Sequence, residues 1–293
     1  MSSRTSGLFL SAAGIALMCC MDAVAKALGA ELTTFQVVFV RFLGAALWLA
    51  LWIGLTRGQW PRPTDFGRQA LRGVMLVATA SMFFYAVTNL ELAVVAALGM
   101  TAPLYVTLIG AIVLKERLDG RAVLALALGA AGAGIIILGG GGLSLESLHG
   151  SALAWAAALL APVSYASILA LLKHHSGREE PAAMTLGQSA VAALLALPLA
   201  LGQMPVISGS TPGLVVLIGL LGAAGFLLVI NGLRRLPVTV FAIIDYTGLL
   251  WAALLGLVFF GEMPAMSFWF GAVLIVGACV LNSGRRAVPA TIG

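Results

Sequence analysis

Charged residues are scarce in this sequence. Asp, Glu, Lys and Arg account for only 9% of the 293 residues, whereas soluble globular proteins carry about 25%. Apolar residues account for 61%, and the mean hydropathy is +1.08. A water-soluble fold cannot bury this much hydrocarbon, so the composition excludes a soluble domain and predicts a polytopic membrane protein.

Metal ligands and disulfide partners are also rare. The three cysteines and three histidines are Cys19, Cys20, Cys279, His149, His174 and His175. The cysteines lie in apolar runs and have neither the spacing of metal ligands nor that of a disulfide framework, and the histidines fall in expected loops. We therefore expect neither a bound metal nor a cofactor.

Sequence motifs of enzymes and pumps are missing as well. The chain contains no His-Glu-x-x-His motif, no Gly-x-Ser-x-Gly motif and no ATP-binding loop. The two acidic residues inside apolar runs, Asp22 and Asp245, are expected nearer opposite membrane faces, which argues against a catalytic carboxylate dyad. These absences exclude a primary pump for this chain alone and leave an intramembrane enzyme or a channel as minor alternatives.

Long apolar runs dominate what is present. Polar residues divide the chain into ten candidate spans, at residues 7–28, 34–56, 70–88, 92–114, 121–139, 151–172, 182–202, 212–231, 238–260 and 265–283. A membrane helix needs about 20 apolar residues, and irregular backbone is not stable in contact with lipid. The sequence therefore predicts an all-α integral membrane protein, a bundle of ten transmembrane helices with short connections.

Lysine and arginine are distributed unevenly between the expected loops. If the N-terminus is cytoplasmic, fourteen of the sixteen Lys and Arg residues fall in cytoplasmic segments, Lys26 falls outside and Arg41 falls within the second span. This distribution follows the positive-inside rule. It predicts a multi-pass protein of the bacterial inner membrane with both termini in the cytoplasm. Topology also accounts for the net charge of +5, so no nucleic acid partner is expected.

The chain contains an internal repeat. An offset of 146 residues aligns Glu116, which closes the fourth span, with Glu262, which closes the ninth. Because each copy has five helices, an odd number, the second copy enters the membrane upside down. Inverted repeats of this kind are typical of secondary transporters, whose substrate site lies between the two copies. The sequence predicts two inverted five-helix repeats, residues 1–142 and residues 143–293.

Short motifs in these spans carry a family resemblance. Val-Leu-Lys-Glu-Arg-Leu ends the fourth span and Val-Phe-Phe-Gly-Glu-Met the ninth, while Val-Phe-Val-Arg-Phe (38–42) and Ala-Pro-Leu (102–104) lie inside the second and fourth. With these motifs the chain resembles the EamA repeat of the drug/metabolite transporter superfamily over nearly its whole length. The first span lacks the Trp-Gly pair that is common in that family. The resemblance implies a small-metabolite permease working by alternating access, often an exporter, and the chain resembles exporters of amino acids, including aromatic ones.

Two oppositely charged residues lie inside the first two spans. In an antiparallel hairpin, Asp22 near the outer end of the first span comes level with Arg41 in the second. Lys26 follows Asp22 by four residues and shares its helix face. The sequence leaves two interpretations open. The residues form either a substrate-binding or proton-sensitive cluster, or a buried pair that fixes the register of the hairpin.

The middle of the fourth and ninth spans carries a repeated pair of side chains. Each pair has a hydroxyl at position i and an aromatic ring at i+4, on one helix face. With three further aromatic residues, the candidate substrate-binding residues are Thr101, Tyr105, Thr247, Trp251, Tyr165, Phe84 and Tyr85. A mostly apolar cavity with a few polar groups suits an amphipathic solute such as an amino acid. The alternative is that these rings pack against neighbouring helices or lipid.

Asp245 is the one carboxylate in the ninth span. The repeat aligns it with Gly99, so it belongs to one copy only, and it lies about seven residues from the cytoplasmic end of the span. At 100° per residue it lies about 200° around the helix from Thr247. Asp245 is therefore either a coupling carboxylate or a structural charge with a local partner, an arginine or a hydroxyl.

Together these observations predict a secondary transporter that exports a small organic metabolite, an amino acid or an aromatic amino acid, by alternating access between the two repeats. A permease for another solute class (nucleotide, sugar or drug-like) is the alternative, and an intramembrane enzyme is the less favoured one. The expected partners are a small-molecule substrate and the lipid bilayer. The protein is expected to be a monomer or a homodimer.

Overall fold

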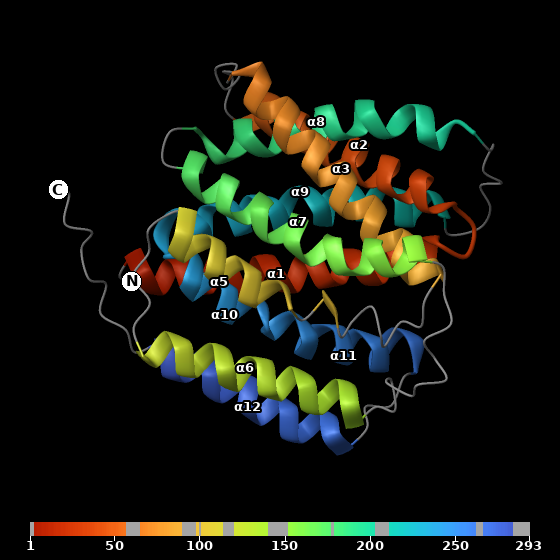
Figure 1. Ribbon diagram of the computed structural model, residues 1–293. Coiled ribbons are helices and arrows are strands. Elements are labelled where there is room, and N and C mark those ends of the chain that lie inside the picture. The colour runs from red at the N-terminus through yellow and green to blue at the C-terminus, as the bar shows by residue number, and fades with distance from the viewer. Residues whose placement is uncertain are drawn as a thin grey trace.

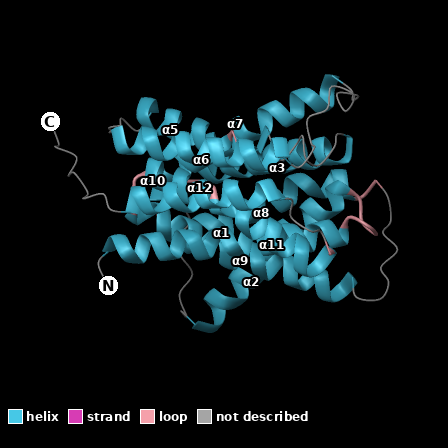
Figure 2. Ribbon diagram, turned by 90° about the horizontal axis from the view of Figure 1, so that it is seen from below, coloured by secondary structure: helices cyan, strands magenta, loops and turns pink. Residues whose placement is uncertain are grey.

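The computed structural model describes residues 3–56, 65–89, 98–99, 101–113, 120–139, 152–176, 179–202, 211–261 and 266–283. Its helices are α1 (Ser3–Leu28), α2 (Thr34–Thr56), α3 (Phe66–Asn89), α5 (Ala102–Val113), α6 (Gly120–Gly139), α7 (Ala152–Ser176), α8 (Pro181–Ala200), α9 (Thr211–Arg235), α10 (Val238–Asp245), α11 (Thr247–Phe260) and α12 (Met266–Ser283). Within these ranges all regular structure is helical, as the two orthogonal views show (Figures 1 and 2).

The helices confirm the predicted ten-span membrane fold. Each predicted span contains helix, and most helix ends lie within about one turn of the predicted ones. Six of the helical segments are long and apolar enough to cross a membrane by themselves, counting α10 and α11 as one span. The chain begins and α12 ends on the same side of the bundle, at the left in Figure 1. An even number of spans requires this.

The two repeats are interwoven in space. The third helix of each repeat packs mainly on the first two helices of the other repeat, so that α9 lies against α1 and α2 while α3 lies against α7 and α8. The last helices of the two repeats, α6 and α12, pack on each other and form a separate pair along one edge of the bundle (Figure 1). The repeats therefore do not form two separate halves. The predicted boundary between residues 142 and 143 lies outside the described residues and remains a prediction.

Glycines set the closest helix crossings. A Cβ built on Gly219 of α9 would lie 2.5 Å from the Cα of Gly44 on α2, so neither position accepts a side chain at this spacing. A Cβ on Gly132 of α6 would lie 2.6 Å from the carbonyl oxygen of Gly271 on α12. Small residues allow such close backbone approach between membrane helices.

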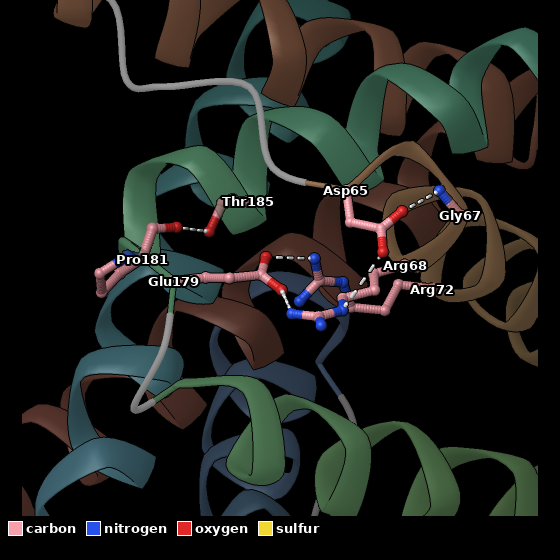
Figure 3. A network of polar contacts seen from close by, with 7 residues as sticks. All are labelled: Asp65, Gly67, Arg68, Arg72, Glu179, Pro181 and Thr185. Atoms are coloured by element: carbon pink, nitrogen blue, oxygen red, sulfur yellow. Dashed lines mark hydrogen bonds and ion pairs between the residues drawn. The ribbon is translucent and has the colours of Figure 1, made fainter.

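A network of ion pairs joins α3 to the connection between α7 and α8 (Figure 3). Arg72 Nη2 donates to Glu179 Oε2 at 2.6 Å, and Arg68 Nη1 lies 3.6 Å from Glu179 Oε1. The side chains of Arg72 and Glu179 are 0% and 3% exposed, so this pair is buried. Asp65, whose side chain is 62% exposed, lies 3.6 Å from Arg68 Nε at the surface. The network fixes α3 to the second repeat.

A corresponding contact lies at the other end of the bundle. The Thr211 hydroxyl at the start of α9 donates to the Glu31 carboxylate in the connection between α1 and α2. In each case an acidic residue from the first connection of one repeat contacts the start of the third helix of the other repeat. The two contacts are thus related by the inversion of the repeats, although one is an ion pair and the other a hydrogen bond to a hydroxyl.

Candidate functional site

Corresponding threonines lie at the same repeat position in the fourth helix of each repeat. In the second repeat α10 ends at Asp245 and α11 begins at Thr247, whose Oγ1 donates to the carbonyl oxygen of Ile244 at 2.6 Å. In the first repeat α5 begins directly after Thr101, whose Oγ1 donates to the carbonyl oxygen of Leu98 at 2.5 Å. Each hydrogen bond satisfies a backbone carbonyl, and the offset of 146 residues relates the two pairs of residues. At Tyr246 the backbone keeps right-handed helical angles (φ −57°, ψ −24°), so the hydrogen-bond pattern is interrupted at one residue and the helix is not unwound.

Asp245 has a hydroxyl partner on another helix. Tyr165 in α7 donates its phenolic hydrogen to Oδ1 of Asp245 across 3.3 Å. Asp245 therefore has a hydroxyl partner, and whether it is a coupling carboxylate or a structural charge remains a prediction. The contact places the end of α10 against α7, in the interior of the bundle.

Asp22 and Arg41 approach the same place from α1 and α2. The two charges interact electrostatically, but they are not among the ion pairs of 4.0 Å or less that join the described residues. Gly222 of α9 lies beside both helices, because a Cβ built there would be 3.5 Å from the Met21 sulfur and 3.9 Å from Arg41 Cγ. Asp22 is exposed and Arg41 is half-buried, so neither is sealed in a tight pair. Asp22, Arg41, Tyr165 and Asp245 together are called the polar cluster below.

Cys19 adds a thiol beside this cluster. Its Sγ donates to the carbonyl oxygen of Gly248, in the first turn of α11, at 3.5 Å. Gly248 lies three residues after Asp245, so α1 contacts the chain just beyond that carboxylate. Cys19 precedes Asp22 by three residues, which places the two side chains on one helix face.

Lys26 lies nearer the end of α1. Its ammonium group is 4.5 Å from the centre of the Phe260 ring, at the end of α11. This cation–π contact joins the two helices at the face of the bundle opposite the N-terminus. Lys26 therefore binds α11 as well as sharing a helix face with Asp22.

The predicted aromatic residues occupy several different environments. Tyr105 and Tyr165 pack against the largest apolar core cluster, and Phe84 packs there too, with its ring edge-on to Phe83 at 5.8 Å between centroids. Tyr85 packs against a separate cluster of small residues that includes Ala157. The Tyr165 hydroxyl donates a hydrogen bond to an intramembrane carboxylate. Substrate contact for the others remains a prediction.

Trp251 lies outside the polar cluster. Its side chain is 37% exposed and lines an apolar groove with Phe9, Ala12, Ala13, Ala16 and Leu17 of α1. This face of α1 points about 150° away from Asp22 at 100° per residue. The structure thus does not bring Trp251 together with Asp22, Arg41 and Tyr165, although the repeat alignment pairs it with Tyr105. The Thr101 and Thr247 hydroxyl hydrogens are already donated to backbone carbonyls.

The polar cluster combines two carboxylates, one guanidinium and one phenol. Such a set can bind an ammonium group and a carboxylate at the same time. In the described part of the chain, no group of three or more metal-ligating side chains comes together.

Comparison with known proteins gives one family and several relatives. The sequence profile of the EamA-like transporter family matches residues 5–138 and residues 152–284, once in each repeat. The chain is 27% identical over 288 residues to the pseudopaline exporter CntI of Pseudomonas aeruginosa, covering 96% of this chain and 97% of the relative. It is 29% identical over 252 residues to the uncharacterized transporter YwfM of Bacillus subtilis, covering 83% and 81%.

A solved crystal structure shares the fold. It superposes with a TM-score of 0.76, covers 96% of both chains and is 19% identical in sequence. At this identity the likeness shows the arrangement of the helices and nothing about the solute.

Proposed function

The chain belongs to the EamA-like transporter family, and from this premise we propose that it exports a small zwitterionic metabolite of the amino-acid type. Export would proceed across the bacterial inner membrane by alternating access between the two repeats, with both termini in the cytoplasm. The outward direction is supported by the name of a relative, an exporter that aligns over nearly its whole length.

The substrate class rests on one observation, the polar cluster. Asp22 and Arg41 carry opposite charges near each other without joining in an ion pair. An unpaired charge inside a membrane protein is expensive, and a solute that carries the complementary charges removes part of that expense. A zwitterion does so for both residues at once, with its carboxylate near Arg41 and its ammonium group near Asp22 or Asp245.

The proposal does not include a preference for aromatic side chains. Such a preference would need several rings beside the polar cluster, and Trp251 lies in the groove on another face of α1. The Tyr165 ring is part of the cluster, but its hydroxyl is already bonded to Asp245. We therefore assign the recognition to the charged ends of the solute.

Solute counterflow in proteoliposomes tests the proposal. Purified protein is reconstituted with unlabelled amino acids inside, and uptake of a labelled amino-acid panel is measured. For an exchanged amino acid, analogues lacking either the carboxylate or the amine should compete about 10- to 150-fold less well, the value of a hydrogen bond to a charged group. Exchange of a nucleotide or sugar without any amino acid would refute the substrate class.

Site variants locate the recognition. Arg41→Gln should strongly lower the apparent affinity for the amino acid. It should change the apparent affinity for the analogue without a carboxylate only a little. Asp22→Asn should show the converse, with little change for the analogue that has no amine. Asp65→Asn serves as the control, because Asp65 lies at the surface with its side chain 62% exposed. If a variant is monodisperse and normally abundant but loses affinity equally for the amino acid and for both analogues, the assigned roles are contradicted.

A further inference from the structure

Tyr246 stands at the interruption between α10 and α11. It is fully buried, with 0% of its surface exposed, although it directly follows the Asp245 carboxylate of the polar cluster. Its ring lies on Gly129 of α6, where a built Cβ would be 2.6 Å from both Cδ2 and Cε2. A side chain at residue 129 would therefore displace the ring.

The surroundings of Tyr246 come from the α6–α12 pair. Its ring belongs to an apolar cluster that it shares with Ala125 and Leu126 of α6, Ile275 of α12 and Ile243 of α10. The α6–α12 pair touches the rest of the described bundle mainly along α10, with smaller contacts to α5 and α11. Tyr246 is thus the largest side chain that connects the interrupted helix to this pair.

Neighbouring residues in the interruption point to different helices. Successive side chains of a helix are about 100° apart, so with the Tyr246 ring on α6 the Asp245 carboxylate is directed to α7, where Tyr165 donates to it. The carbonyl oxygen of Gly248, two residues after Tyr246, accepts a hydrogen bond from the Cys19 thiol of α1. A rotation of this segment would move all three contacts together.

We propose that Tyr246 is a positioning residue for transport. Its ring, held on Gly129, sets the rotation of the interrupted helix and so directs Asp245 towards Tyr165 and the solute. The hydroxyl of Tyr246 is buried and has no hydrogen-bond partner among the described residues, so the ring carries this role. The inference rests on the proposed function only in assigning solute recognition to Asp245.

Transport kinetics supply the first test. Gly129→Ala and Tyr246→Leu should raise the half-saturation constant about tenfold, as expected for one weakened hydrogen bond to a charged group, with the maximal rate per folded protein retained. Tyr246→Phe should behave like the wild type. Gly134→Ala is the matched control on α6, because a Cβ at residue 134 meets nothing within 4 Å. In an Asp245→Asn background, Gly129→Ala should cause no further rise. A full additional rise would overturn the proposal.

Alkylation of Cys19 supplies a second test that needs no solute. In protein whose Cys20 and Cys279 are replaced by Ser, Gly129→Ala should change the alkylation rate of Cys19 several-fold, because the Gly248 carbonyl moves away. Gly134→Ala and Tyr246→Phe should leave that rate unchanged. Equal rates in the Gly129→Ala and Gly134→Ala proteins would refute the positioning role. If the labelling changes as expected but no zwitterion exchanges, the proposed substrate class falls and the positioning role stands.

Discussion

Replacing Glu179 with Gln should destabilise the folded protein by about 3–5 kcal/mol, the effect of removing one partner from a buried ion pair. Glu179 Oε2 accepts a hydrogen bond of 2.6 Å from Arg72, and the two side chains are 3% and 0% exposed. Glutamine keeps the shape of the side chain but not its charge. The guanidinium of Arg72 would then remain buried without a counterion, and that uncompensated charge accounts for most of the loss.

The surface pair in the same network is the control. Asp65 and Arg68 lie 3.6 Å apart, with side chains 62% and 39% exposed. Water screens such a pair, so Asp65→Asn should lower the stability by only about 0.2–1 kcal/mol. The two substitutions make the same chemical change within one network, and burial is the main difference between them.

The measurement is the melting temperature of detergent-purified protein, determined from the fraction that stays monodisperse after heating. At about 2–4 °C per kcal/mol, Glu179→Gln should lower the melting temperature by roughly 6–20 °C. Adding Arg72→Met to Glu179→Gln should recover part of the loss, because the unpaired charge is then gone. A fall for Glu179→Gln no larger than that for Asp65→Asn would refute the reasoning from burial.

Three further predictions concern packing, the polar cluster and a helix end. Gly219→Ala should destabilise the crossing of α2 and α9 by about 1–3 kcal/mol, whereas Gly54→Ala, where a Cβ meets nothing within 4 Å, should be neutral or stabilising; the melting temperatures of the two proteins compare them. Tyr165→Phe removes the donor to Asp245 and should raise the half-saturation constant about tenfold in counterflow without loss of abundance. Lys173→Met removes a donor to two backbone carbonyls at the end of α9 and should lower the melting temperature, and an unchanged value would show that those carbonyls find other partners.

The helix positions are predictable from the sequence because hydropathy acts over a whole span. The second span is expected at residues 34–56, and α2 is Thr34–Thr56. The inverted arrangement of the two repeats follows from the offset of 146 residues and the odd number of helices in each copy. The packing of α9 on α1 and α2 does not follow, because the hydropathy of a span carries no information about its neighbours.

The interruption of the ninth span is not predictable from local residues. Residues 238–260 contain no proline and form one continuous apolar run around Asp245. The fourth span does contain Pro103, which lies at the start of α5 and removes a backbone donor there. In the second repeat the interruption coincides instead with Tyr246 packed on Gly129, a contact between residues more than a hundred positions apart.

The candidate site is only partly predictable for the same reason. The short connection between the first two spans predicts that Asp22 and Arg41 lie at a similar depth. However, α1 and α2 pack on α9 and not on each other. The partner of Asp245 is 80 positions away in sequence, and no periodicity indicates it. Alignment of the repeats pairs Trp251 with Tyr105. An alignment shows which positions correspond but not which side chains surround them. Trp251 borders α1 in an exposed groove.

The exchange of third helices between the repeats has a consequence for biosynthesis. About 150 residues separate the end of α2 from the start of α9, which corresponds to roughly 8–30 s of translation at 5–20 residues per second. Until α9 is made, the α1–α2 hairpin is in the bilayer with the Gly44 face uncovered. Helices α1 and α2 must therefore remain in the membrane without degradation before their packing partner is made. That partner, α9, is complete only when four-fifths of the chain has been synthesised.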